Sequence, residues 1–287
     1  MLWFNLSLGS AFFDATYFML IKRYLKTADF YLLAAGVSLF SFLITMSVSL
    51  WHGLPVIGSD FLPYFLASSG FEIVAMILYF KVLQSYDMSL TLPILSFTPV
   101  FLVVTSFFIL GEAPTLLGLI GILLVVVGSY FLNLDRQSTN ALHPFKMLFK
   151  NQGTRMMLGV ALIWGVETNF IKVAVLNSDP YFTAAAFSLA LGAAFLTLAY
   201  VKGEPIVSGF RRHGRSFFLA GLVVSISAVL TNIAFTLQIV AYVVSIKRLS
   251  VLFSVFYGAI LFNEDDFQKR LVGAGIMVLG SVVILLF

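Results

Sequence analysis

The sequence of 287 residues lacks cysteine altogether, so disulfides, thiolate metal sites and a cysteine nucleophile are excluded. Histidine is nearly absent too, because only His52, His143 and His213 occur, and all three fall between the long apolar runs of the chain. Neither a histidine metal site nor a histidine proton relay is then expected within an apolar segment. We therefore predict no metal, no other cofactor and no catalytic residue, and we expect a protein that is not an enzyme.

Charged residues are scarce as well. They make up 10% of the chain, against roughly 25% in soluble domains, whereas apolar residues reach 60% and the mean hydropathy is +1.02. This composition excludes a soluble protein and predicts an all-α membrane protein, because a helix of about 20 apolar residues crosses a bilayer. Ten such transmembrane helices are expected, with no soluble domain among them. They span residues 2–21, 30–50, 61–81, 89–110, 114–133, 156–175, 181–200, 216–237, 241–262 and 270–287.

The few basic residues gather in particular loops. The odd-numbered connections between predicted helices hold most of them, and the even-numbered ones and both chain ends hold few. By the positive-inside rule the odd-numbered loops are cytoplasmic, which places both termini outside a multi-pass protein of the cell (inner) membrane. The formal charge of +4 thus reflects topology, and the expected partner is the lipid bilayer rather than nucleic acid. The loop residues are Lys22, Arg23, Lys26, Arg136, Lys146, Lys150, Arg155, Lys202, Arg211, Arg212 and Arg215.

The first half of the chain is repeated in the second. Residues 8–55 realign on 158–205 at a constant spacing of 150, and from Phe101 and Phe253 onward the spacing is 152. Each repeat contains five predicted helices, and an odd number inverts the second repeat relative to the first in the membrane. We therefore predict two inverted five-helix repeats around a central cavity, joined by a cytoplasmic linker. The predicted boundaries are residues 1–135, 136–155 and 156–287.

Three runs in the first repeat have counterparts in the second. They are Pro93-Ile-Leu-Ser-Phe-Thr-Pro-Val-Phe101, Leu110-Gly-Glu-Ala113 and Leu117-Gly-Leu-Ile-Gly121, matched by Phe253-Ser-Val-Phe256, Phe262-Asn-Glu264 and Leu271-Val-Gly273. Over essentially the whole chain, this pattern resembles the EamA repeat of the drug/metabolite transporter superfamily. The resemblance implies a ten-helix secondary carrier that works by alternating access, with a central cavity lined by the first, third, fourth, sixth, eighth and ninth helices. It implies no particular solute.

Five ionisable residues lie well inside predicted helices, away from the helix ends, where insertion costs about 2.5–3.5 kcal/mol each unless the charge is paired or faces water. Asp14, Glu72 and Glu167 lie near the middle of the first, third and sixth segments, and Lys247 and Arg248 lie in the ninth. We predict that all five bind substrate. The three acids are also proton-coupling candidates, because a poorly solvated carboxylate can take up a proton on one side and release it on the other. Internal pairing without a substrate role is the alternative.

The Lys247-Arg248 pair, followed by Ser254 and Phe256, also resembles the motif with which the triose-phosphate/nucleotide-sugar branch of the superfamily holds a substrate phosphate. Adjacent residues point about 100° apart on a helix. Because Lys247 shares its face with Ser250, we assign Lys247 to the substrate and Arg248 to a carboxylate partner. Snorkelling of both side chains to the interface is the alternative. The neighbouring acids argue against a purely anionic solute.

Four uncharged residues complete the predicted site. Asn232 and Ser250 lie on polar faces of the eighth and ninth segments, and Trp164 and Tyr79, with Phe71, could form an aromatic cage. The solute therefore stays open. An amino-acid-like zwitterion or an anion-bearing solute is the first hypothesis, and a quaternary amine or other cation, or the polyprenyl-phosphate-linked substrate of a flippase, is the alternative. A monomer or a homodimer is expected.

Other features predict architecture rather than chemistry. Pro93 and Pro99 should interrupt the fourth segment, because proline removes a backbone donor. Glycines of the fifth and tenth segments should allow close helix contacts. Glu112 and Glu264 stand at equivalent helix ends, where we expect them to cap the helices that follow.

Overall fold

The computed structural model describes residues 1–25, 28–86, 88–133, 150–262 and 267–286, together with 142 and 146. Helices make up this part of the chain and no strand occurs in it, so the predicted all-α class is confirmed. The predicted linker at 136–155 lies largely outside the described residues, as does Glu264. The helices are α1 (Leu2–Tyr24), α2 (Phe30–His52), α3 (Phe61–Ser85), α4 (Met88–Leu95), α5 (Thr98–Leu110), α6 (Leu116–Asn133), α8 (Gln152–Leu176), α9 (Pro180–Val201), α10 (Ile206–Leu237), α11 (Val240–Lys247), α12 (Ser250–Phe262) and α13 (Phe267–Leu286).

Membrane spans are recognised by length and apolar composition. Within the described ranges, eight helical segments meet both criteria, and two of these segments join α4 with α5 and α11 with α12. Leu116–Leu132 and Val272–Leu286 are apolar but shorter. The chain is therefore a multi-pass membrane protein, in agreement with the composition.

The repeat is visible in how helices begin. Asp29 caps α2 by accepting hydrogen bonds from the backbone of Tyr31 at 2.7 Å and Leu32 at 3.3 Å. Its equivalent 150 residues later, Asp179, caps α9 in the same way, through bonds to the next two backbone donors at 2.6 and 2.8 Å. These carboxylates satisfy backbone N–H groups that a helix leaves unpaired at its start.

The fourth predicted segment is interrupted, as the prolines predicted. Helix α4 ends at Leu95 and α5 begins at Thr98, with a proline in its first turn. The ninth segment, which we predicted as one helix over 241–262, is interrupted as well, between Lys247 and Ser250.

The two interruptions are equivalent in the repeat, being 152 residues apart. Ser96 N and Phe97 N bond to carbonyls three residues back at 3.2 Å, and so do Arg248 N at 3.2 Å and Leu249 N at 3.0 Å. Such tightened turns break the regular α-helical pattern. No proline stands in the second interruption, which is why the sequence did not predict it.

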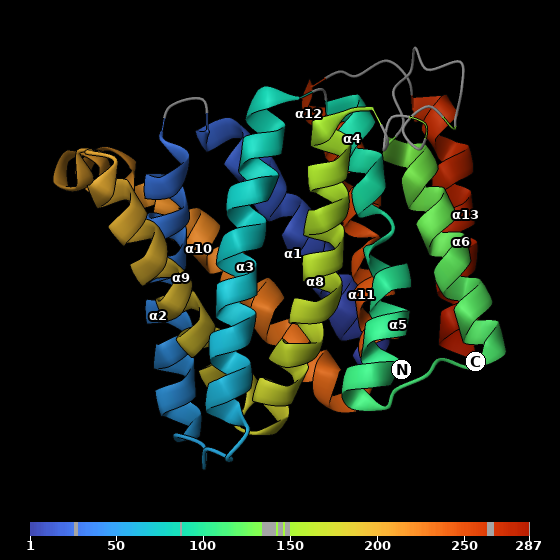
Figure 1. Cartoon of the computed structure of the whole chain (residues 1–287), viewed down its shortest axis with the longest axis horizontal. Coiled ribbons are helices and arrows are strands. Elements are labelled where there is room, and N and C mark those ends of the chain that lie inside the picture. The colour runs from blue at the N-terminus through green and yellow to red at the C-terminus, as the bar shows by residue number, and fades with distance from the viewer. Residues whose placement is uncertain are drawn as a thin grey trace.

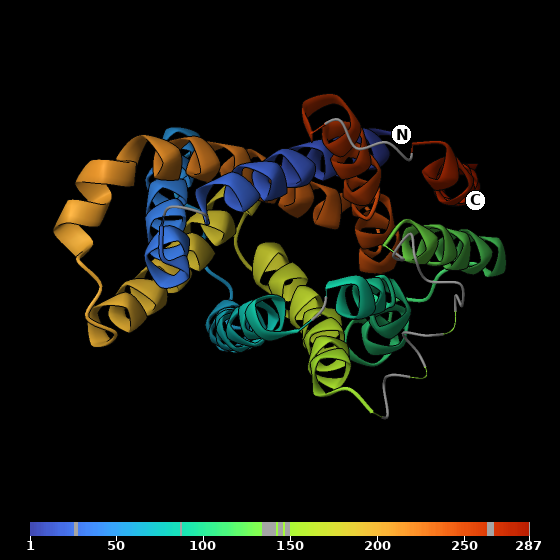
Figure 2. The same ribbon diagram turned by 90° about the horizontal axis from the view of Figure 1, so that it is seen from above.

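Helices of the first half pack mainly against helices of the second half. Helix α1 packs on α10, α2 on α9, α3 on α8 and α6 on α13. In both views α6 and α13 lie together at one edge of the bundle, and α2 and α9 at the opposite edge (Figures 1 and 2). The two chain ends lie at the same end of the bundle, and α1 leads away from that end whereas α8 leads towards it (Figure 1).

Glycines hold α6 and α13 in close contact, as predicted. A Cβ atom at Gly128 would lie 2.6 Å from the carbonyl oxygen of Gly273, and one at Gly121 would lie 2.8 Å from that of Gly280. Only a residue without a side chain allows these backbones to approach so closely. This contact fixes the edge of the bundle, and the polar residues gather between the two edges.

Candidate functional site

A cavity of about 310 Å³ opens between the two halves, and the five ionisable residues predicted for the site all line it. Of the nine predicted site residues, eight contribute to its walls, and Tyr79 does not. The eight are Asp14, Glu72, Trp164, Glu167, Asn232, Lys247, Arg248 and Ser250. The structure therefore brings these residues together, and their role in substrate binding stays a prediction.

Helix α9 also lines the cavity, which neither the residues nor the resemblance had indicated. It contributes Thr183, Ala184, Phe187 and Ser188. Thr183 and Ser188 are buried hydroxyls in an otherwise apolar helix, and that polarity is the signal that could have identified this wall. Further unpredicted lining residues are Phe18, Thr98, Thr168, Ile171, Ala228, Thr231, Phe235 and Val244.

Lys247 forms an ion pair with Asp14. Its Nζ lies 3.3 Å from Asp14 Oδ2, and the two side chains are 25% and 21% exposed. Asp14 Oδ1 accepts a short hydrogen bond from Ser227 Oγ, which in turn lies 2.8 Å from Ser10 Oγ. The ammonium of Lys247 thus has an internal counter-charge that is itself held in place by hydroxyls of α1 and α10.

Glu72 is held by an aromatic donor. Trp164 Nε1 on α8 donates a hydrogen bond of 2.7 Å to Glu72 Oε2 on α3, which links the two repeats across the cavity wall. The Tyr79 ring lies 5.6 Å from the Trp164 ring but outside the cavity. Of the three aromatic residues considered for a cage, only Trp164 lines the cavity, because Phe71 turns to the ring of Phe170 at 5.8 Å.

Glu167 and Arg248 are left incompletely paired. Glu167 is 5% exposed, its Oε2 accepts only a long bond of 3.4 Å from Thr168, and its buried Oε1 has no partner. The buried Nε of Arg248 also has no partner, and the guanidinium forms no ion pair with any carboxylate that the structure describes. Our expectation that Arg248 takes a carboxylate partner stays a prediction. Both cations line the cavity, and Asp14 forms its ion pair with Lys247.

Asn232 and Ser250, two of the uncharged residues predicted for the site, differ in their hydrogen bonds. Asn232 Nδ2 donates to the carbonyl oxygen of Pro180 at 3.0 Å, which ties α10 to the start of α9. Ser250 begins α12 directly after the interruption, and its backbone carbonyl accepts a hydrogen bond from Ser254 Oγ at 2.8 Å. Both residues position neighbouring elements as well as lining the cavity.

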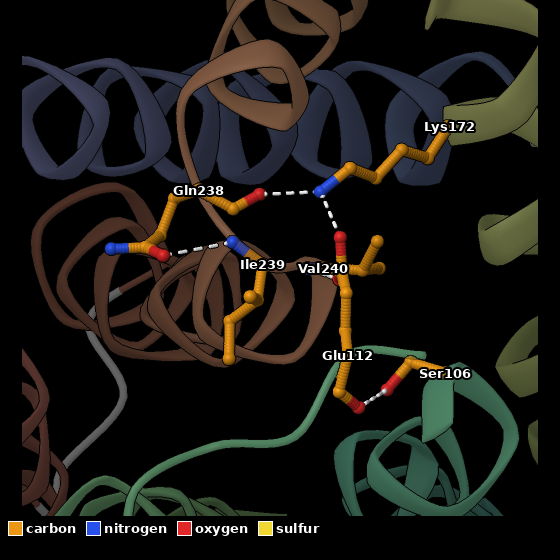
Figure 3. A network of polar contacts seen from close by, with 6 residues as sticks. All are labelled: Ser106, Glu112, Lys172, Gln238, Ile239 and Val240. Carbon is orange, nitrogen blue, oxygen red and sulfur yellow. Dashed lines mark hydrogen bonds and ion pairs between the residues drawn. The ribbon is translucent and has the colours of Figure 1, made fainter. Parts of the chain in front are cut away.

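A second charged network lies at the end of the bundle that carries the termini (Figures 1 and 3). Lys172 Nζ on α8 donates to Glu112 Oε1 at 2.5 Å and to the carbonyl oxygen of Gln238 at 2.7 Å. Glu112 Oε2 accepts from Val240 N, at the start of α11, at 2.9 Å. The backbone carbonyl of Glu112 also accepts from Ser106 Oγ at 3.5 Å (Figure 3).

This network corrects the expectation for Glu112. The carboxylate caps α11 of the second half rather than α6, the helix that follows it in sequence. The negative charge favours the helix N-terminus that it reaches, and Lys172 compensates it. The sequence did not predict the pairing of Lys172 with Glu112, because nothing local indicates a partner so distant in the chain.

Comparisons with known proteins identify the fold and the family of this chain. No curated protein matches the sequence. A solved structure described only as "Crystal structure of protein" covers 99% of this chain and 97% of its own, with a TM-score of 0.78 and 17% sequence identity, and it shows a shared fold. The model of the EamA-like transporter family matches residues 1–134 and again 152–286. Two matches of the same model confirm the repeat and the resemblance, and the chain belongs to the EamA-like transporter family.

Proposed function

We propose that this protein is a secondary transporter that moves a small polar metabolite by alternating access between its two repeats. The observation that carries the proposal is a cavity in which three carboxylates and two cations from both repeats converge. Charges are expensive inside a bilayer and are retained where they serve a solute or ion pathway. A volume of about 310 Å³ lies at the lower end of the range of roughly 300–1,000 Å³ that is usual for small-molecule sites, which favours a small solute.

The proposed topology has ten transmembrane helices in two inverted repeats, with both termini outside the cell (inner) membrane. Support comes from the opposite course of α1 and α8 and from the two chain ends at one end of the bundle (Figure 1). Lys22 and Arg23 close α1 at the other end, where the positive-inside rule places the cytoplasm. Even-numbered connections carry few basic residues, which supports the same orientation.

The solute proposed first is an amino-acid-like zwitterion or an anion-bearing metabolite, since the cavity offers both signs of charge. Coupling to protons is part of the proposal, with Glu72, Glu167 and Asp14 as the carriers. A quaternary amine or other cation is the second candidate. The observation in its favour is that the acids outnumber the cations in the lining, which also includes the aromatic side chain of Trp164.

The test begins with thermal unfolding of the purified protein in detergent against metabolites grouped by charge. A ligand present at 100 times its dissociation constant should stabilise the folded state by about 2.7 kcal/mol. The compounds that stabilise it are then assayed for exchange in proteoliposomes. Loaded vesicles should accumulate labelled solute by counterflow, and empty vesicles containing protein should not.

Failure of every stabilising compound to exchange across the vesicle membrane would refute a transporter. Exchange of amines alone would favour the second candidate. Movement of a labelled polyprenyl phosphate between leaflets, without exchange of soluble metabolites, would favour a flippase.

A further inference from the structure

We propose that Glu167 and Arg248 hold the two charged ends of the transported solute, which therefore carries a cationic group and an anionic group. The inference rests on the proposed transport function and assigns the recognition within that cavity. It differs from the expectation drawn from sequence, in which Lys247 takes the anionic end.

The charges in the cavity differ in whether they have partners. Asp14 and Lys247 form an ion pair and largely neutralise one another. Glu72 accepts the strong donor Trp164 Nε1 at 2.7 Å. Glu167 and Arg248 are left as the cavity charges whose buried polar atoms have no partner in the part of the chain that the structure describes.

The atoms without partners in Glu167 and Arg248 raise the free energy of the empty site. A buried charge without a partner is strongly unfavourable, and proteins normally pair such groups or expose them to water. A solute ammonium beside Glu167 Oε1 and a solute carboxylate or phosphate at Arg248 would satisfy both. Guanidinium suits the anionic end, because its planar fork matches the two oxygens of such a group.

The two repeats differ at this position. Arg248 stands in the interruption between α11 and α12, and its equivalent in the first repeat is Ser96 between α4 and α5. Ser96 is buried and lies 2.9 Å from Ser129 Oγ, so the same interruption is built around a serine side chain in the first repeat. The backbone feature therefore does not require a cation at this position. Interrupted helices are also where transporters of this general kind bind charged groups.

A solute with only one sign of charge satisfies only one of the two residues. A pure anion would pair with Arg248 and leave Glu167 Oε1 without a donor. A pure cation would satisfy Glu167 and leave the Arg248 guanidinium unpaired. A zwitterion satisfies both groups and leaves the formal charge of the site unchanged.

The experiment uses matched probes and the full-length protein in detergent. The probes are α-amino acids, their primary amides, which lack the carboxylate, and their N-acetyl derivatives, which lack the ammonium. Affinities come from ligand-dependent thermal stabilisation. In the wild type, an amino acid should bind at least tenfold more tightly than either derivative, which corresponds to about 1.4 kcal/mol.

The variants determine which residue senses which end. Arg248→Gln should remove the preference for the amino acid over its amide and keep the preference over the N-acetyl derivative. Glu167→Gln should do the opposite. Arg248→Lys keeps a cation without the fork and should retain part of the first preference, which controls for misfolding. Arg211→Gln, on the exposed surface of α10, is the control for the loss of a charge elsewhere.

The outcomes are separable. If Lys247→Gln removes the preference for the free carboxylate and Arg248→Gln preserves it, the assignment is overturned. If a single-charge derivative binds as well as the amino acid and exchanges across vesicles, transport stands and the zwitterion falls. If none of the three probe classes binds, the inference is overturned as well, and counterflow with other solutes decides the transport function separately.

Discussion

Replacing Lys172 by methionine removes one side of the buried network that joins the two halves at the end carrying the termini. The side chains of Lys172 and Glu112 are only 7% and 18% exposed, so water replaces little of the lost interaction. Two charge-assisted hydrogen bonds disappear, to Glu112 and to the carbonyl of Gln238, at about 1.5–3 kcal/mol each. Breaking one side of a buried pair costs about 3–5 kcal/mol in general, which agrees with that sum.

The assay is a double-mutant cycle on unfolding free energies in detergent, followed by tryptophan fluorescence. Lys172→Met and Glu112→Gln should each destabilise the protein by about 3 kcal/mol or more. The double variant should be less destabilised than the sum, with a coupling energy of about 1–3 kcal/mol, because it leaves no unpaired charge. Lys81→Met, at an exposed position near the end of α3, is the matched control and should change stability by less than about 0.5 kcal/mol.

A coupling energy near zero, with both single variants close to the wild type, would refute the reasoning. It would mean that the two side chains are solvated in the bilayer-embedded protein and that the halves are held at this end by apolar packing alone.

Three further predictions concern other parts of the molecule. Gly128→Leu should destabilise the folded protein by about 1–3 kcal/mol, because the new Cβ would lie 2.6 Å from a backbone carbonyl oxygen of α13. Gly159→Leu is the control, because a Cβ at Gly159 would meet nothing within 4 Å. Equal losses of unfolding free energy in denaturant would contradict this prediction. Asp179→Ala should cost about 1 kcal/mol by removing the cap of α9, and Asp179→Asn should retain most of it. Trp164→Phe should weaken binding of any stabilising solute about tenfold in thermal shifts, since Glu72 loses the donor that orients it; unchanged affinity would place Glu72 outside the site.

The sequence predicted the parts of the fold that depend on local composition. Apolar runs located the helices, and Pro93 and Pro99 marked the first interruption. These features depend on residues within one turn of each other, and so they can be read from the chain alone.

Partners distant in the chain could not be predicted in the same way. Asp14 pairs with Lys247, and Glu112 pairs with Lys172, because the helices of one repeat pack against those of the other. Polarity indicated that Asp14 and Lys247 belong near a cavity, but which acid meets which base depends on helix packing. The interruption at Arg248 has no proline to signal it, since packing against neighbouring helices maintains a backbone course that the local sequence does not dictate.

The paired interruptions also bear on how the molecule diverged after duplication. If the two repeats were identical, the inward-facing and outward-facing states would have equal free energies and would be populated equally. A guanidinium stands in one interruption and a neutral serine in the other, at Arg248 and Ser96, so exchanging the conformations of the two repeats does not regenerate the same molecule. Under the alternating-access mechanism proposed above, the two states of the empty protein are therefore expected to differ in free energy, which two identical repeats would not allow.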